Sequence, residues 1–278
     1  MRVFAIGDTH LAHAVDKPMD IFGPQWVDHA GKIARAWRER VGEDDLVLVV
    51  GDISWAMTLE EAKPDLQWLE DLPGRKLMIR GNHDYWWPGP KKMRAILPPS
   101  VDFLRNDARV IEGVGIAGTR GWDCPPAGWK PTPDEPNARG DDRKPPAGAV
   151  WDDQHPAGRR YDEQDLKIYR REVERLRVSL ADLERRGGAE VRVAMVHYPP
   201  MNGAHEPSGF TEVLEEAGVG LCVYGHLHGE GHRVAFNGER NGVVYRCVAC
   251  DFIDFAPVPI VGAGPRLEPL PTRGAEDR

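Results

Sequence analysis

Five short apolar runs in this 278-residue chain end in side chains that can bind a metal or move a proton. Imidazole, carboxylate and amide groups offer metal ligands, phosphate contacts and proton donors. One histidine after a strand is commonly a packed or surface residue, but five such ends are hard to explain as coincidence. The residues concerned are Asp8 and His10; Asp52; Asn82, His83 and Asp84; His197; and His226 with His228.

The elements that carry these residues read as strands joined by helices. Apolar runs at 3–6, 46–50 and 76–80 alternate with helical spacing at 28–40 and 59–69, which predicts β-α-β-α-β order. Parallel strands joined by helices place their ligand sites at the carboxyl edge of the sheet. Further strands are predicted at 191–196 and 221–224, so all five polar ends can converge.

The donors indicate a transition-metal site. Carboxylates, one amide and imidazoles without thiolate suit Mn, Fe, Zn or Co better than Ca. The donors exceed one tetrahedral site and fit two octahedral metals that also hold water. Cys247 and Cys250 form a C-x-x-C without a second pair, and they are expected to be buried strand residues.

The motif set resembles that of the calcineurin-like metallophosphoesterases, and within them the bacterial predicted phosphohydrolases. The resemblance covers residues 1 to about 255 and implies an α/β fold: a four-layer αββα sandwich of two mixed sheets flanked by helices. A dinuclear metal site would lie at the carboxyl-terminal strand edges. The matching motifs, in order, are Asp8-x-His10, Gly51-Asp52, Gly81-Asn82-His83-Asp84, His197 and Gly225-His226-x-His228.

The resemblance implies two divalent or trivalent metal ions, with Mn, Fe or Zn expected, that share the Asp52 carboxylate. A water activated by the two metals would attack phosphorus. His83 would be the general acid, and Asp84 would hydrogen-bond it and fix its tautomer. The ligands implied are Asp8, His10, Asp52 and His228 for one metal, and Asp52, Asn82, His197 and His226 for the other.

Four residues near the motifs are weaker candidates for binding substrate. Arg120 follows a predicted strand and could grip phosphate with its guanidinium fork. His13 could contact phosphate or the leaving group, and Tyr198 follows a ligand directly. Trp86 could stack on a base or sugar, although packing under a loop is an equal alternative.

The expected activity is that of a phosphodiesterase or phosphatase on a soluble, phosphorylated small molecule or nucleotide. The alternatives are a nucleotide pyrophosphohydrolase, a phosphoprotein phosphatase and, less favoured, a non-catalytic scaffold of the same fold. The natural substrate, the monoester or diester preference, the metals and the oligomeric state stay open at this point.

Composition sets further limits. The net charge of −8 gives no strong nucleic-acid-binding signature, because such binding depends on Lys and Arg. No apolar run approaches the roughly 20 residues of a membrane span. The N-terminus begins at once with a predicted strand, so a cytoplasmic protein without a signal peptide is expected.

A single domain is predicted for residues 1–255. It would contain an irregular insertion followed by a long helix at about 123–187, the helix starting at 162. The remaining residues, 256–278, are rich in Pro and Gly and are expected to form a tail.

Overall fold

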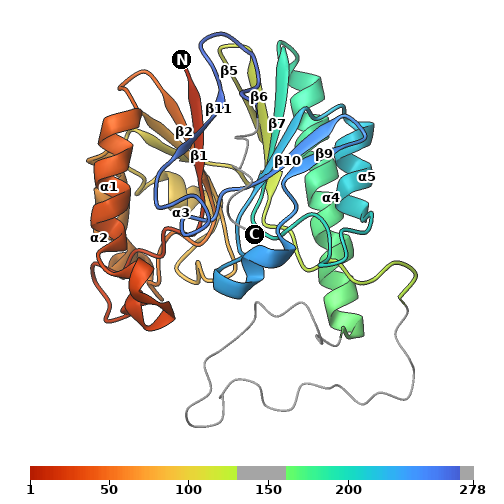
Figure 1. The fold of residues 1–278 in the computed structure, drawn as a ribbon. Coiled ribbons are helices and arrows are strands. Elements are labelled where there is room, and N and C mark those ends of the chain that lie inside the picture. Colours follow the sequence, from red (N-terminus) through yellow and green to blue (C-terminus); the bar gives the residue numbers. More distant parts are fainter. Residues whose placement is uncertain (130–160, 270–278) are drawn as a thin grey trace, which may run out of the picture.

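Two mixed β-sheets pack face to face in the computed structural model, which describes residues 1–129 and 161–269 (Figure 1). In the first sheet, four neighbouring strands run parallel and one edge strand runs antiparallel. Its order is β11 (Val258–Val261), β1 (Val3–Ile6), β2 (Leu46–Val50), β3 (Arg75–Ile79) and β4 (Val101–Phe103).

The second sheet has a parallel centre with an antiparallel strand at each edge. The order is β5 (Ala108–Ile111), β6 (Val114–Thr119), β7 (Val191–Val196), β8 (Leu221–Tyr224), β10 (Val243–Cys247) and β9 (Gly238–Arg240).

Helices cover the outer face of each sheet, so the molecule has four layers (Figure 1). The first sheet carries α1 (His29–Arg40), α2 (Leu59–Glu70) and α3 (Pro90–Arg94), and the second carries α4 (Glu163–Arg186) and α5 (Gly209–Glu216). Short 3-10 helices occur at Met19–Phe22, Pro24–Trp26 and Gly229–Val234.

Strand β2 shows why the layers form. Its five residues are all buried, and successive side chains of a strand point to opposite faces. Val47 and Val49 pack with the helices, whereas Leu46, Leu48 and Val50 pack into the core between the two sheets. A strand that is apolar on both faces therefore separates two cores, and the predicted αββα sandwich is confirmed.

Local sequence signals set the helix ends. Helix α2 begins with a capping box, in which the Thr58 side chain accepts from the amide of Glu61 and the Glu61 side chain accepts from that of Thr58. Asp162 and Asp165 form the same arrangement at the start of α4. None of the helices in the described ranges has the length and apolar composition needed to cross a membrane.

The carboxyl-terminal segments differ from the sequence expectation. The predicted tail from 256 begins as a strand, because Val258–Val261 pairs with β1 and completes the first sheet. Strand β10 is antiparallel to β9 and parallel to β8. Most of the expected insertion (130–160) and the end of the tail (270–278) lie outside the described residues.

Candidate metal centre

The polar ends of β1, β2, β3, β7 and β8 meet at one edge of the sandwich. Four of these residues adopt left-handed backbone conformations, which cost energy for any residue other than glycine. Such conformations turn the chain sharply after the strand and aim the side chain at the common edge. They are Asp8 (φ 58°), His10 (φ 43°), Asp52 (φ 49°) and His226 (φ 73°).

Two glycines leave room for the carboxylates of the centre. A Cβ at Gly81 would collide with the Asp52 carboxylate and main-chain nitrogen, and a Cβ at Gly225 would collide with the Asp8 carboxylate. The glycines at these strand ends are therefore required by the close approach of acidic side chains from neighbouring strands.

One group of donors combines Asp8, His10 and His228. The Nε2 atoms of the two histidines lie 3.3 Å apart, and Asp8 Oδ1 is 3.5 Å from His228 Nε2. The Oδ2 atom of Asp52 is 4.0 Å from His10 Nε2. All four side chains predicted for one metal thus face the same small volume.

The second group combines Asn82, His197, His226 and Asp52. Asn82 Oδ1 lies 2.6 Å from His197 Nε2 and 3.1 Å from His226 Nδ1. Asp52 Oδ2 lies 3.4 Å from His197 Nε2. Because this same oxygen also faces His10, the structure places Asp52 between the two groups, where a bridging ligand would lie.

Hydrogen bonds to the outer ring nitrogens orient two of the histidines. His197 Nδ1 donates to the Val50 carbonyl at 3.0 Å, and His228 Nδ1 lies 2.6 Å from Asp251 Oδ1. Each ring then presents Nε2 to the centre, an arrangement found around metal-bound histidines. Asp251 was missed from the sequence, although it follows the end of β10 as the other acidic residues follow theirs.

Burial and charge divide the histidines into two kinds. Burial lowers the pKa of His10 and of His226 well below the ordinary value, so these rings are neutral and can ligate. Burial also acts on His197 and His228, but nearby carboxylates raise their pKa values to about 9 and about 10. Carboxylates in a buried cluster repel one another, and they are stabilised by positive charge from protons or from metal cations.

The donor set fits transition metals. Buried carboxylate, amide and imidazole atoms converge without a thiolate, and the Nδ1 atom of His10 is buried without a hydrogen-bond partner among the described residues. Such mixed oxygen and nitrogen sites suit Mn, Fe or Zn.

His83 lies at the rim of the centre, outside both donor groups. Its main-chain nitrogen donates to Asp52 Oδ1 at 2.8 Å, and its Nε2 atom is 4.0 Å from Asp52 Oδ2. The side chain is 21% exposed. The ring of Trp55 lies 4.6 Å from that of His83 and stacks on His10 at 4.8 Å. Trp55 was missed, and its position three residues after Asp52 is the only sequence signal for it.

Asp84 has a different role from the expected contact with the His83 imidazole. Its carboxylate accepts hydrogen bonds from the main-chain nitrogens of Gly81, Ile53 and Ser54. It also accepts one from the indole nitrogen of Trp86 at 3.0 Å. These contacts fix the loops that carry Asp52 and Asn82. Asp84 therefore holds the backbone that positions these two donors.

The weaker candidates fall into different environments. Trp86 is buried to 3% exposure in the core, which corrects the expectation that it could stack on a substrate. Tyr198 is also buried, with its ring 4.1 Å from that of His226. His13 is held by Asp65, whose Oδ1 lies 2.7 Å from His13 Nδ1. Arg120 lines a pocket between the two halves of the sandwich.

Known proteins similar to this chain include viral and bacterial ones. The Gene 66 proteins of Mycobacterium phages D29 and L5 are 42% identical over 84 residues and 37% over 86 residues. These matches cover 30% and 31% of this chain and 40% and 39% of theirs. The chain therefore spans about two-fifths of the curated relatives that it matches.

Two solved structures align over most of the chain at low identity. A protein of unknown function from Aquifex aeolicus is 15% identical, covers 93% of this chain and 95% of its own, and has a TM-score of 0.43. A phosphopantetheinyl hydrolase from Mycobacterium tuberculosis is 17% identical, covers 91% of both chains and has a TM-score of 0.47.

The sequence model of one protein family, described as calcineurin-like phosphoesterase, matches residues 1–230. That range contains all the strand-end motifs that the fold brings together. By this match, the chain belongs to the family of calcineurin-like phosphoesterases.

Proposed function

We propose that this protein hydrolyses phosphoester bonds in a small, soluble phosphorylated substrate, as a metal-dependent phosphodiesterase or phosphatase. One observation carries the proposal: two groups of buried donors share the Asp52 carboxylate, and a partly exposed histidine, His83, stands at their rim. A site of this kind can clamp a phosphate while a proton donor faces the leaving group.

We assign one metal to each of the two donor groups, with Asp52 belonging to both. Bound there, a pair of Mn, Fe or Zn ions would lower the pKa of a water nucleophile and draw negative charge from the phosphate. The first group would be Asp8, His10, Asp52 and His228, and the second Asp52, Asn82, His197 and His226.

His83 has the position required of a proton donor. Its amide is anchored to Asp52, and Trp55 packs against its ring, so the imidazole is held beside the donor groups without belonging to them. Protonated, it would stabilise a developing phosphate charge and deliver its proton to the departing oxygen. A positioned acid of this kind contributes about 10²–10⁴ in rate.

The test compares hydrolysis of bis-p-nitrophenyl phosphate with that of p-nitrophenyl phosphate by metal-stripped protein resupplied with Mn. The matched variants are Asp52→Asn, which removes the shared charge, and His83→Gln, which keeps a polar side chain of similar size. We expect Asp52→Asn to lose both metals and turnover. His83→Gln should keep the metals and lose about 10²–10⁴ in kcat.

Each outcome has a definite meaning. Diester turnover would establish a phosphodiesterase, and turnover of the monoester alone would establish a phosphatase. Two bound metals without turnover of any phosphoester would contradict the proposal and favour a scaffold. Failure to bind a transition metal would contradict the assigned centre itself.

A further inference from the structure

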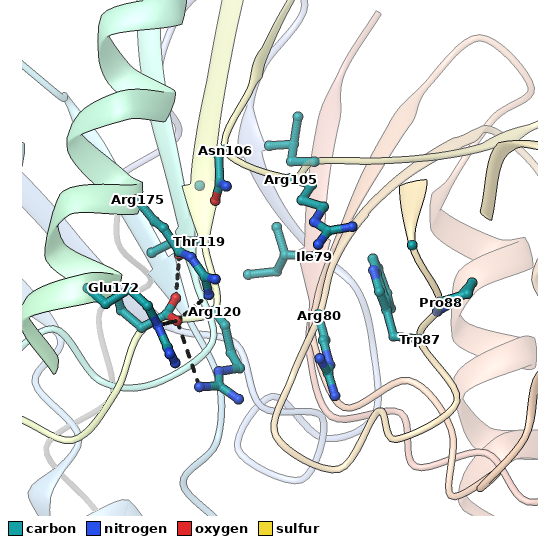
Figure 2. Close-up of a pocket in the computed structure, with 14 residues that line it drawn as sticks. Ile79, Arg80, Trp87, Pro88, Arg105, Asn106, Thr119, Arg120, Glu172 and Arg175 are labelled. Atoms are coloured by element: carbon teal, nitrogen blue, oxygen red, sulfur yellow. Dashed lines mark hydrogen bonds and ion pairs between the residues drawn. The ribbon is translucent and has the colours of Figure 1, made fainter. Parts of the chain in front are cut away.

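A pocket rich in arginine lies between the two halves of the sandwich (Figure 2). Its volume is about 340 Å³. Among the described residues that line it, five are arginines and one is acidic, in a chain whose net charge is −8. These six residues are Arg80, Arg105, Arg120, Arg171, Arg175 and Glu172.

One wall of the pocket comes from α4 and the end of β6. Glu172 is fully buried, and its carboxylate accepts from the Thr119 hydroxyl at 2.8 Å. The same carboxylate pairs with Arg175 at 2.5 Å and lies 3.7 Å from Arg171 and 3.8 Å from Arg120. A single negative charge is thus shared by three guanidinium groups, which leaves this wall positive.

The opposite wall comes from the ends of β3 and β4 and holds Arg80 and Arg105 (Figure 2). Arg80 uses its Nε atom to donate to the Asp84 carbonyl at 3.1 Å. Guanidinium groups thus line both walls of the cavity, Arg80 and Arg105 on this one and Arg120 on the other.

An unused donor adds to this evidence. The Nε atom of Arg120 is buried and has no hydrogen-bond partner within the described residues. Buried donors are normally satisfied, so an unsatisfied guanidinium nitrogen beside a positive cavity indicates an acceptor from outside the chain. Guanidinium groups match the oxygens of phosphate in geometry and charge.

Two arginines of the pocket lie close along the chain, or by a main-chain hydrogen bond, to donors of the centre. Arg80 lies two residues before Asn82, so their Cα atoms are at most about 7 Å apart. The carbonyl of Arg120 accepts the main-chain hydrogen bond of His197 at 3.0 Å. The loops that carry Asn82 and His197 therefore also carry arginines of the pocket, so one substrate can reach both sites.

We propose that this pocket binds a second phosphate group of the substrate, so that the preferred substrates carry two phosphates at a fixed spacing. The proposal rests on the hydrolytic function above and specifies its substrate class. The scissile phosphate lies at the metal centre, and the second phosphate lies between Arg80 and Arg105 on one side and the arginines of α4 and β6 on the other.

The experiment uses alkane-1,n-diol bisphosphates as a molecular ruler, with chains from two to eight methylenes and the matching monophosphates as controls. Binding to the Mn-loaded full chain carrying His83→Gln is measured by titration calorimetry, so that no turnover is needed. We expect one chain length to bind about tenfold or more tightly than its monophosphate, as expected for hydrogen bonds to a charged group.

Two variants and a control locate the effect. Arg105→Gln and Arg171→Gln should each remove most of that preference while leaving monophosphate binding unchanged. The control is Arg177→Gln. Arg177 also lies on α4, but it pairs with Glu174 and Glu216 outside the pocket, so this variant should keep the preference for the bisphosphate.

Three results would overturn the proposal: equal affinity for bisphosphates and monophosphates at every length, a preference that survives both variants, or binding of inorganic phosphate at the pocket without any bisphosphate preference. The last would make the pocket a site for free phosphate. Because the readout is binding, these failures leave the hydrolytic function standing, whereas failure of hydrolysis shows itself as two bound metals without turnover.

Discussion

Asp251 illustrates how much of the proposed metal centre depends on a residue that contacts an assigned ligand, His228. Its carboxylate lies 2.6 Å from His228 Nδ1 and is almost fully buried. A carboxylate in this place fixes the ring orientation and makes the imidazole a better ligand. We expect Asp251→Asn to lower Mn affinity by about 10–100-fold.

The measurement for Asp251 is competition with a fluorescent chelator, together with circular dichroism to follow folding. Asp254→Asn is the matched control, since Asp254 is exposed and its left-handed backbone (φ 53°) suits asparagine equally well. Unchanged Mn affinity in Asp251→Asn would show that the contact between the Asp251 carboxylate and His228 Nδ1 does not contribute to metal binding.

At the residue scale, the sequence revealed the donors because each follows an apolar run within a recognisable motif. Asp84 belongs to such a motif and Trp86 lies two residues after it, yet their roles are local packing and hydrogen bonding, which residue type alone does not distinguish from catalysis. Asp251 and Trp55 escaped because their contacts depend on which strands and loops become neighbours.

The turns at the strand ends are closely packed, so some positions have no room for a Cβ atom. In Gly81→Ala the new methyl group would collide with the Asp52 carboxylate and its main-chain nitrogen, both buried. We expect the variant to lose Mn binding and about 1–3 kcal/mol of unfolding free energy, as for overpacking of a well-packed interior.

Metal content by mass spectrometry and urea unfolding test the Gly81 prediction. Gly89→Ala is the control, because a Cβ at Gly89 meets open space. If the Gly81→Ala variant kept two metals per chain and normal stability, the prediction would be wrong, and the loop after β3 would be able to move to make room for the methyl group.

Strand β3 also carries a buried lysine with a pH signature. Burial lowers the pKa of Lys76 from 10.5 to about 8, while its Nζ atom donates to the Leu72 carbonyl and to Ser100. Above pH 8 the unfolded chain holds this proton and the folded one does not, so this lysine's contribution to stability rises with pH. Below pH 8 both states are charged and the penalty is fully present.

The comparison is therefore between wild type and Lys76→Met in urea at pH 7.5 and pH 10. We expect wild type to gain about 2 kcal/mol of unfolding free energy relative to Lys76→Met between pH 7.5 and pH 10. Lys63→Met, at an exposed ion pair with Glu60, should show no such shift. A constant difference for Lys76→Met would mean that the buried amine keeps its ordinary pKa.

At the element scale, helices were easier to predict than strand partners. The ends of α2 and α4 follow from capping residues a few positions apart, so a local pattern contains the information. The pairing of β11 with β1, and of β10 with β8, joins segments distant in sequence. Apolar alternation indicates that a strand exists but not what it pairs with.

Across the whole molecule, the proposed metal centre joins two halves that have separate helix-covered cores. Its donors come from β1, β2 and β3 on one side and from β7 and β8 on the other. Because metals bind the folded arrangement, Mn at about 100 times its dissociation constant should add about 2.7 kcal/mol of stability per site.

Urea unfolding with and without Mn, or with a chelator, measures this coupling. Asp52→Asn should lose most of the gain, since the shared ligand serves both groups. A protein that binds Mn by mass spectrometry yet unfolds at the same urea concentration would show that the metals do not favour the folded state.

For the molecule as a whole, the family resemblance predicted the four layers, and the alternation of apolar runs and helices along the chain predicted the convergence of the motifs. The pocket of arginines was represented only by Arg120. Its other members come from β3, β4 and α4, and only the packing of the two sheets against each other brings them together.

The position of β11 beside β1 also has a consequence for synthesis. Roughly 250 residues separate these strands, so at about 5–20 residues per second the ribosome needs on the order of 10–50 s between them. During that time the edge of β1 lacks its final partner, and His226 and His228 also emerge late. The nascent amino-terminal half therefore has an open strand edge and an incomplete ligand set until β8 and β11 have been synthesised.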